Sequence, residues 1–223
     1  MLPIPYYEEQ ECKIYHGDAI DILPNIRGDL ILSDFPYAIG EKYDEYEDTN
    51  DNLKSLIDNL FPLMLKSAPV VMLSCGVGNM YKYPVPNWVL SWVTPAGAGS
   101  GPWGFCCWQP ILVYGKDPYL RDGLGRRPDT YINTEISKIN GHPCPKPIST
   151  WKWMLMRGST KESDVIIDPL CGSGTTLIAA RDLGHKSIGI EKSEKYCALA
   201  VERLRQRVLK FGNNSDISDG LFL

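Results

Sequence analysis

One segment, 164–191, constrains the fold of this chain more than any other. Its apolar runs and glycines predict a strand at 164–167, a glycine turn at 168–174, a helix at 175–183 and a second strand at 187–190. This order is typical of a doubly wound α/β fold, where backbone N–H groups of the turn approach a ligand at the positive helix end. An acid about 20 residues further on accepts hydrogen bonds from ribose hydroxyls in such folds. Glu191 ends the second strand, so the segment predicts a site for an adenosine-containing ligand.

The glycine spacing also narrows the kind of ligand. Gly172 and Gly174 match the first two glycines of the dinucleotide motif GxGxxG, but Leu177 occupies the place of the third. A dinucleotide cofactor is therefore less well indicated than a ligand with a single adenosine.

The other apolar patterns predict one α/β domain over 1–211 and a flexible polar tail at 212–223. An amphipathic helix is expected between Leu53 and Leu65, with Pro62 as a kink. Glycine and proline are so frequent at 95–104 that we expect no regular structure there. Further strands are expected at 13–15, 29–33, 69–74 and 109–115, and a further helix from Pro147 to about Arg157.

The net charge of −4 hides an uneven distribution of charge. Residues 1–60 contain 4 Lys and Arg against 14 Asp and Glu, whereas residues 116–161 contain 9 against 4. All six tryptophans lie within 61–161. Basic and aromatic side chains together suit a surface that contacts phosphates and stacks on bases, although tryptophans also belong in cores. The composition of 61–161 therefore leaves two interpretations open, contact with nucleic acid and burial of the tryptophans in a core.

The cysteines and histidines do not form a recognisable metal or disulfide pattern. The chain has seven cysteines without a CxxC pair and three histidines, so we expect reduced thiols and no metal. No apolar run is long enough to span a bilayer, and the N-terminus lacks the order of a signal peptide. These features lead us to expect a soluble, cytoplasmic protein.

Four segments resemble motifs of the β-class, or permuted, DNA amino-methyltransferases that use S-adenosylmethionine. Ser33–Tyr37 (SDFPY) is similar to the catalytic motif (D/N/S)PP(Y/F/W), and His142–Pro147 (HPCPKP) to HPxxKP. Asp168–Thr176 (DPLCGSGTT) resembles the cofactor loop DPFxGSGTT, and His16–Ala19 (HGDA) the GDA element. The catalytic motif comes first, which is the permuted order, and the resemblance extends over about 13–209.

The resemblance implies a Rossmann-like, mostly parallel sheet with helices on both faces and a small target-recognition insertion. It also implies methyl transfer from S-adenosylmethionine to the exocyclic amino group of a base flipped out of double-stranded DNA. The catalytic residues would be Asp34, Phe35, Pro36 and Tyr37. Asp34 and the Phe35 carbonyl would accept hydrogen bonds from the amino group, while Tyr37 would stack on the base.

For the cofactor, the resemblance implies that Asp18 binds the adenine amine and Glu191 the ribose hydroxyls. Asp168 and the turn backbone would line the methionine and ribose, and Lys146 is a candidate partner of the methionine carboxylate. His142 and Cys144 could be interpreted as a Cys/His pair for nucleophilic catalysis. The surrounding prolines indicate a shaped turn instead of a nucleophile. The expected cofactor-binding residues are Asp18, Lys146, Asp168, Pro169, Cys171, Gly172, Ser173, Gly174, Thr175 and Glu191.

The expected DNA contacts come from the basic and aromatic region. Within 81–141, the region that the resemblance assigns to DNA, we expect target recognition in 116–141 and the aromatic loop at 81–108 close to the flipped base. Such a small region suggests a short recognition site or help from a second subunit. The residues expected to contact DNA are Trp103, Arg121, Arg126, Arg127 and Lys138. The resemblance also implies a phage or bacterial enzyme associated with restriction–modification.

Several alternatives remain open at this point. Asp34 favours adenine N6 as the target, with cytosine N4 as the alternative. Phe35 stands where the family pattern has proline, so a catalytically silent protein that binds S-adenosylmethionine or DNA is a second alternative. RNA and protein-glutamine methyltransferases usually place the cofactor loop before the catalytic motif, which is the reverse of the order in this chain.

Overall fold

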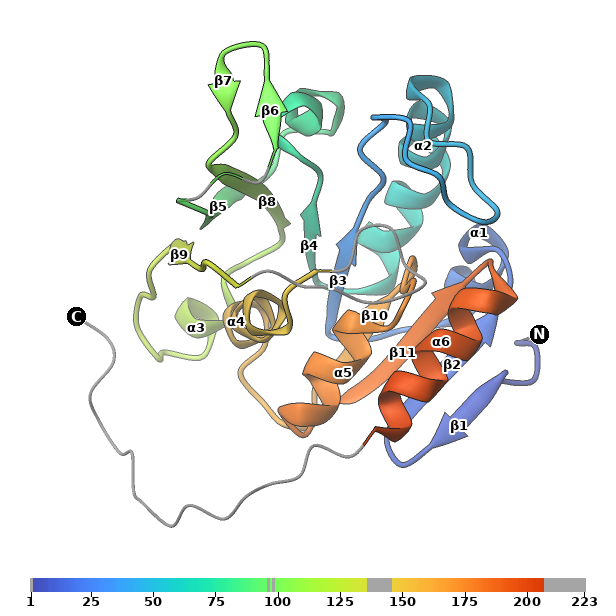
Figure 1. The fold of residues 1–223 in the computed structure, drawn as a ribbon. Coiled ribbons are helices and arrows are strands. Elements are labelled where there is room, and N and C mark those ends of the chain that lie inside the picture. The colour runs from blue at the N-terminus through green and yellow to red at the C-terminus, as the bar shows by residue number, and fades with distance from the viewer. Residues whose placement is uncertain (1, 96, 98, 136–145, 207–223) are drawn as a thin grey trace.

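A nine-stranded sheet with helices on both faces forms the centre of the molecule (Figure 1). The computed structural model describes residues 2–95, 97, 99–135 and 146–206. Across the sheet the strands follow the order β1-β2-β11-β10-β3-β4-β8-β5-β9. Their bounds are β1 Tyr7–Glu9, β2 Cys12–His16, β3 Leu30–Asp34, β4 Val70–Ser74, β5 Trp88–Val93, β8 Trp108–Tyr114, β9 Thr130–Ile132, β10 Val165–Asp168 and β11 Lys186–Glu191.

Most neighbouring strands are parallel. β2, β11, β10, β3 and β4 run in one direction, while β8 runs against both of its neighbours, β4 and β5. β9 is parallel to β5 at one edge of the sheet, and β1 is antiparallel to β2 at the other. The expected α/β class with a mostly parallel sheet is therefore confirmed.

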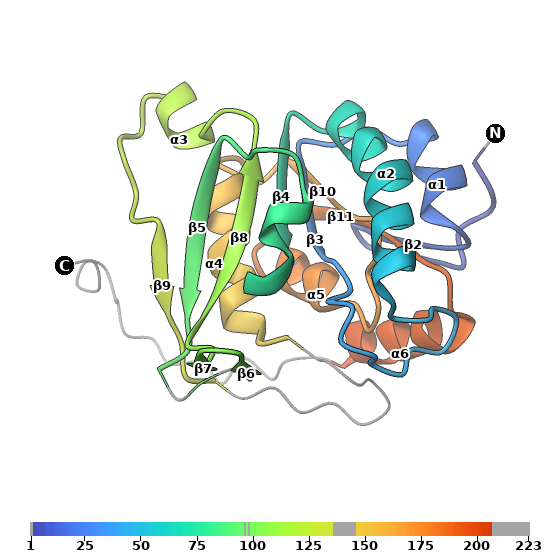
Figure 2. The same cartoon turned by 90° about the horizontal axis from the view of Figure 1, so that it is seen from above.

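Successive residues of the central strands face opposite helical layers, as the period of a strand requires. Ile31 belongs to a core with α1 (Ala19–Ile22) and α2 (Asn50–Ser67). Leu30 and Leu32 belong to a core with α4 (Ile148–Gly158) and α5 (Thr175–Asp182). α6 (Glu194–Arg205) packs beside β2 and β11, and Figure 2 shows it on the opposite side of the sheet from α2. Burial on both faces explains why these strands read as continuous apolar runs.

The helix predicted at 53–65 is longer than its apolar pattern. α2 starts at Asn50 because the Thr49 side chain accepts a hydrogen bond from the N–H of Asn52, and the helix continues through Pro62 to Ser67. The helix predicted from Pro147 is found at Ile148–Gly158, with Pro147 at its N-cap.

The prediction of no regular structure at 95–104 is wrong in part. β6 (Ser100–Gly101) and β7 (Gly104–Phe105) form a short hairpin inside this segment, between β5 and β8. Gly104 supports the turn with a φ of 114°, a conformation that favours glycine. β5 itself was not predicted, and it is held by pairing with β8 along its whole length. The hairpin projects from the body of the sheet (Figure 1).

Candidate active site

A cavity of about 420 Å³ lies where the parallel strands end. β3 ends at Asp34, β10 at Asp168 and β11 at Glu191, and all three residues line the cavity. The carboxyl ends of parallel strands are where α/β proteins bind ligands, and this volume lies within the range of about 300–1,000 Å³ for small-molecule sites.

Most of the predicted site residues line this cavity. The lining includes Asp18, Asp34, Pro36, Lys146, Asp168, Pro169, Cys171, Gly172, Ser173, Thr175 and Glu191. Phe35, Tyr37 and Gly174 do not line the cavity. Phe35 and Gly174 are neighbours in sequence of residues that line it, and Tyr37 donates a hydrogen bond to Asp34. The structure therefore brings together motifs from the first and last thirds of the chain.

Asp34 lies at the centre of a polar cluster. Its Oδ2 is 3.1 Å from the Lys146 Nζ, and its Oδ1 accepts a hydrogen bond from the Tyr37 hydroxyl at 3.2 Å. The Tyr37 hydroxyl also shares a hydrogen bond of 2.7 Å with the Ser74 Oγ. Burial raises the pKa of the Asp34 carboxyl above its ordinary value, while Lys146, Tyr37 and Ser74 oppose that shift. Lys146, Tyr37 and Ser74 thus favour the ionised form of Asp34 against the effect of burial.

Tyr37 is held from the side of β4. Its ring lies against Gly76, where an added Cβ would be 3.2 Å from the Cδ2 of Tyr37. Asn79 donates a hydrogen bond of 2.7 Å from Nδ2 to the Tyr37 carbonyl oxygen. The Lys146 Nζ is 4.6 Å from the centroid of the Tyr37 ring, a cation–π distance. These contacts place an aromatic face and a cation beside the same carboxylate.

Backbone donors and an acid form the opposite wall of the cavity. The N–H of Gly172 donates to Glu191 Oε2 and the N–H of Ser193 to Oε1, each at 2.8 Å. Burial raises the pKa of Glu191, and these backbone N–H groups oppose the shift. Gly174 begins α5 with a φ of 79°, and a Cβ there would lie 2.9 Å from the Cβ of Ala200. The turn is a close-packed cradle that requires glycine at this position.

Asp168 connects the glycine turn to β3, the strand that ends at Asp34. Its Oδ1 accepts hydrogen bonds from Ser33 Oγ at 2.9 Å and from the N–H of Leu170 at 3.1 Å, and its Oδ2 accepts one from Thr176 Oγ1. Trp151 Nε1 donates to that threonine hydroxyl at 3.0 Å. Burial raises the pKa of Asp168 to about 7. Both Asp168 oxygens therefore serve the fold, although the residue lines the cavity.

Asp18, expected at the adenine, has a second role in the structure. Its Oδ1 caps α1 by accepting the N–H of Ile20 at 2.9 Å, and its Oδ2 lies 3.5 Å from the Lys192 Nζ. Sequence reasoning missed this lysine and also the loop at 43–47, which contributes to the wall of the cavity. That loop is tied across the site because Ser193 Oγ donates to Asp44 Oδ2 at 2.6 Å. The acidic composition of the loop was visible in the sequence, but nothing there indicated this position.

Trp103 lies at the turn of the β6–β7 hairpin and is fully exposed. The hairpin joins the end of β5 to the start of β8. Because β8 is antiparallel to β4, both points lie on the side of the sheet where β3 ends with Asp34. Phe105, on the same hairpin, is also largely exposed. The structure thus places an exposed aromatic element on the active-site side.

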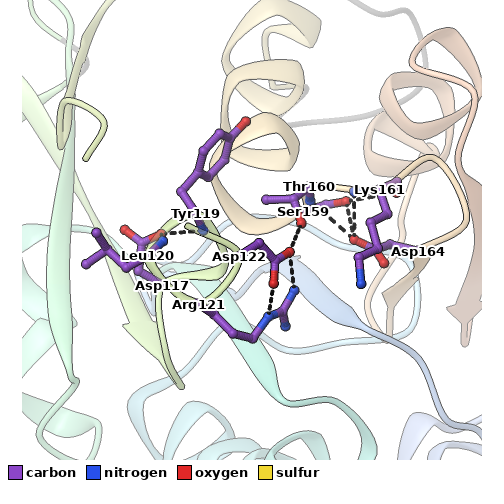
Figure 3. Close-up of polar contacts among 9 residues, drawn as sticks. All are labelled: Asp117, Tyr119, Leu120, Arg121, Asp122, Ser159, Thr160, Lys161 and Asp164. Carbon is purple, nitrogen blue, oxygen red and sulfur yellow. Dashed lines mark hydrogen bonds and ion pairs between the residues drawn. The ribbon is translucent and has the colours of Figure 1, made fainter. Parts of the chain in front are cut away.

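The predicted arginines lie on the side of the sheet formed by the other ends of the strands, away from Asp34. This side is called the far edge below. Tyr114, the last residue of β8, pairs with Val71 near the start of β4, so the chain leaves β8 far from Asp34. There α3 (Pro118–Arg121) packs against α4. Thr160 Oγ1, in the segment that leads into β10, donates a hydrogen bond to Asp122 Oδ2, just after α3 (Figure 3). Arg121 donates from Nε and Nη2 to the Asp122 carboxylate at 2.7 and 2.9 Å (Figure 3). Arg121, Arg126 and Arg127 all belong to this β8–β9 connection.

Three residues singled out in the sequence, Lys138, His142 and Cys144, lie outside the described residues. Among the residues that the structure describes, no group of three or more His, Cys, Asp and Glu side chains is arranged to hold a metal ion. Within the same residues, no helix has the length and apolar character needed to cross a membrane.

Comparisons with known proteins agree with this geometry. The N6/N4 methyltransferase family model, described as DNA methylase, matches residues 91–202. The Type II methyltransferase M.HpaI of Haemophilus parainfluenzae is 36% identical, over 86% of this chain and 74% of its own length. The solved M1.HpyAVI–SAM complex has a TM-score of 0.62 at 21% identity, covering 87% of this chain and 99% of its own. The cytosine-N4-specific PvuII DNA methyltransferase has a TM-score of 0.67 at 15% identity, covering 95% and 90%. The family-model match and the 36% identity to M.HpaI together show that this chain belongs to the N6/N4 DNA methylase family.

Proposed function

We propose that this DNA methylase transfers a methyl group from S-adenosylmethionine to adenine N6 at a specific DNA site. The observation that carries the proposal is the shared cavity, in which Asp34 of the catalytic motif faces the glycine turn of the cofactor motif. A nucleoside-binding wall and an acceptor for an amino group are the two parts that this reaction needs.

The residues present fit S-adenosylmethionine. The cavity has the volume of a small-molecule site, and Gly172 and Ser173 bring backbone close to it. Both Glu191 oxygens accept one backbone N–H, and each can accept another hydrogen bond, which suits the two ribose hydroxyls. Lys146 is the cation for the methionine carboxylate, and Asp18 is the acceptor for the adenine amine. When bound, S-adenosylmethionine supplies an electrophilic methyl group.

The chain's own contribution is to orient the target amino group. Asp34 and the Phe35 carbonyl each accept one N–H, which turns the nitrogen lone pair out of the base plane and toward the methyl donor. Tyr37, whose ring is held by Gly76 and Asn79, stacks on the base. In the structure Lys146 pairs with Asp34. Lys146 would hold the methionine carboxylate when S-adenosylmethionine is bound, and Asp34 would then be left to accept from the base.

A base within a duplex does not reach this cavity, so the target base has to be flipped out. The β6–β7 hairpin with Trp103 is the element we assign to the DNA next to the flipped base, because it lies on the active-site side. Arg121, Arg126 and Arg127 lie at the far edge, so their proposed contacts are to phosphates away from the target base. Lys138 remains a proposed contact by sequence alone.

The small recognition region also leads us to propose a second subunit on DNA. Sedimentation of the chain with a DNA fragment tests this. A dimer on DNA is expected, and a monomer alone at saturating protein would contradict it.

Cytosine N4 is the second candidate target, and it is favoured by the fold likeness to the cytosine-N4-specific PvuII methyltransferase. Asp34 tilts our choice toward adenine. The deciding experiment incubates the chain with methyl-labelled S-adenosylmethionine and mixed-sequence DNA, digests the DNA and separates the nucleosides by mass spectrometry. Labelled N6-methyldeoxyadenosine is expected. Labelled N4-methyldeoxycytidine would show that the target is cytosine N4 and not adenine N6. DNA without label would indicate a catalytically silent binding protein.

A further inference from the structure

Phe35 departs from the family's catalytic motif, and its side chain points away from the cavity. It is 1% exposed and packs in the core between α2 and the sheet. Its ring meets Tyr83 edge-on, with centroids 5.7 Å apart. Phe61 of α2 contacts the same tyrosine at 6.3 Å and Tyr114 at 4.7 Å. These four residues are called the aromatic cluster below.

The backbone of Phe35 makes a contact that the family's proline cannot make. The Phe35 N–H donates to the carbonyl oxygen of Ser74 at 3.1 Å. Proline lacks an N–H, so a proline at this position would leave that carbonyl without this donor. Ser74 also bonds the Tyr37 hydroxyl through its Oγ, so one residue of β4 contacts the catalytic turn twice.

We propose that Phe35 is the anchor that positions the catalytic turn, replacing the rigidity of a proline ring by two contacts. Its N–H fixes the turn to β4, and its ring fixes the turn to the aromatic cluster. Both contacts hold Phe35 itself from either side of its Cα, and so limit the movement of the Phe35 carbonyl, the proposed acceptor for the target amino group. This inference rests on the proposed function and removes the main reason to regard the site as silent.

The proposal makes Tyr83 a positioning residue. Tyr83 does not line the cavity, yet its ring lies between Phe35 and Phe61. Its buried hydroxyl has no hydrogen-bond partner among the described residues, so the ring alone carries the role. A purely structural role in the core would change stability without changing the rate of the chemical step.

The first test compares Phe35→Pro with Phe35→Leu. Phe35→Pro restores the family residue but removes both contacts, and we expect kcat to fall about 100-fold, as a displacement of roughly 1 Å would cause. Phe35→Leu keeps the N–H and an apolar side chain, so its loss should stay below about tenfold. The affinity for S-adenosylmethionine, measured by calorimetry, should be retained in both variants, because the cofactor wall is not altered.

The second test uses Tyr83→Leu and Tyr83→Phe. It tests the anchoring role of Phe35 even if the Phe35→Pro variant fails to fold. Tyr83→Leu should lower kcat while the KM for S-adenosylmethionine stays constant, and Tyr83→Phe should restore kcat. Equal kcat in Tyr83→Leu and wild type, or a Phe35→Pro variant as active as wild type, would overturn the anchoring role. A wild-type chain that transfers no methyl group would instead overturn the proposed function, and the anchoring role with it.

Discussion

The two flanks of the sheet use different means to form binding surfaces. On the flank formed by β10, α5 and β11, the strands are parallel and buried, and the groups offered to a ligand are backbone N–H groups and strand-end acids. On the flank formed by β8, β5 and β9, one strand reverses, and a hairpin with exposed aromatic side chains projects from the sheet. A small cofactor that never varies suits the rigid cradle, whereas a long polymer is reached by projecting side chains.

Removing Asp34, where the two flanks meet, should have the largest effect. Asp34→Ala is expected to lower the rate of methyl transfer by about 10²–10³-fold, the cost of removing one preorganised polar group from a reacting centre. The affinity for S-adenosylmethionine should not fall, since Asp34 does not contact the glycine turn and its removal leaves Lys146 for the methionine carboxylate. Transfer of labelled methyl and equilibrium dialysis measure the two quantities.

Asp58→Ala is the matched control for that variant. Asp58 is an exposed aspartate of α2 that pairs with Lys54, so its removal should leave the rate unchanged. An Asp34→Ala variant with the wild-type rate would contradict the assignment of the catalytic motif.

The cradle is tested by comparing Gly174→Ala with Gly184→Ala. Both glycines have φ near 80°, so both variants should lose about 1–2 kcal/mol of unfolding free energy from backbone strain. Only at Gly174 does the new Cβ meet a neighbour, at 2.9 Å from the Cβ of Ala200. Gly174→Ala alone should therefore also lose affinity for S-adenosylmethionine, by about tenfold, corresponding to about 1.4 kcal/mol. Denaturant titration and calorimetry check this, and equal affinities in the two variants would count against the cradle.

The projecting flank is tested with two tryptophans. Trp103→Ala should weaken DNA binding by about 1–3 kcal/mol, the usual value of stacking between a base and an aromatic ring. Thermal stability should not change, because Trp103 is fully exposed. Trp88→Ala is the control, since Trp88 is an exposed tryptophan that pairs with Val113 and bonds Asp129 at the opposite edge. Fluorescence anisotropy with a labelled duplex measures both variants, and equal losses would break the comparison.

The smallest effect is expected at the far edge of the same flank. Arg126→Ala should weaken DNA binding only a few-fold at low salt and reduce the salt slope by about one, as the loss of a single phosphate contact does. The kcat should equal that of wild type, because the arginine is remote from Asp34. A lower kcat in Arg126→Ala would show that the arginines act near the target base.

Sequence reasoning works well for the cofactor flank because its signals are local. The segment 164–191 combines apolar runs with glycines at turns, and its strands and helix lie within a residue or two of their predicted bounds. The placement of Asp34 at the end of a buried strand is predicted for the same reason.

The other flank could not be predicted because its placement depends on strand direction. Nothing local shows that β8 is antiparallel, and that single reversal moves Arg121, Arg126 and Arg127 to the far edge. The ion pair of Lys146 with Asp34 depends likewise on segments distant in sequence. The burial of Phe35 could not be read from a motif whose usual residue is proline.

The strand order has a consequence for how the chain folds. β10 and β11, from the last third of the chain, lie between β2 and β3, from the first. During synthesis β3 can pair with β4, but its other edge stays open until β10 arrives, and such an open apolar edge invites wrong pairing. The glycine turn and Glu191 follow β3 and β4 in the chain, so S-adenosylmethionine cannot assist the pairing of those two strands during synthesis. Because long-range pairing forms slowly, we expect the centre of this sheet to close late in folding.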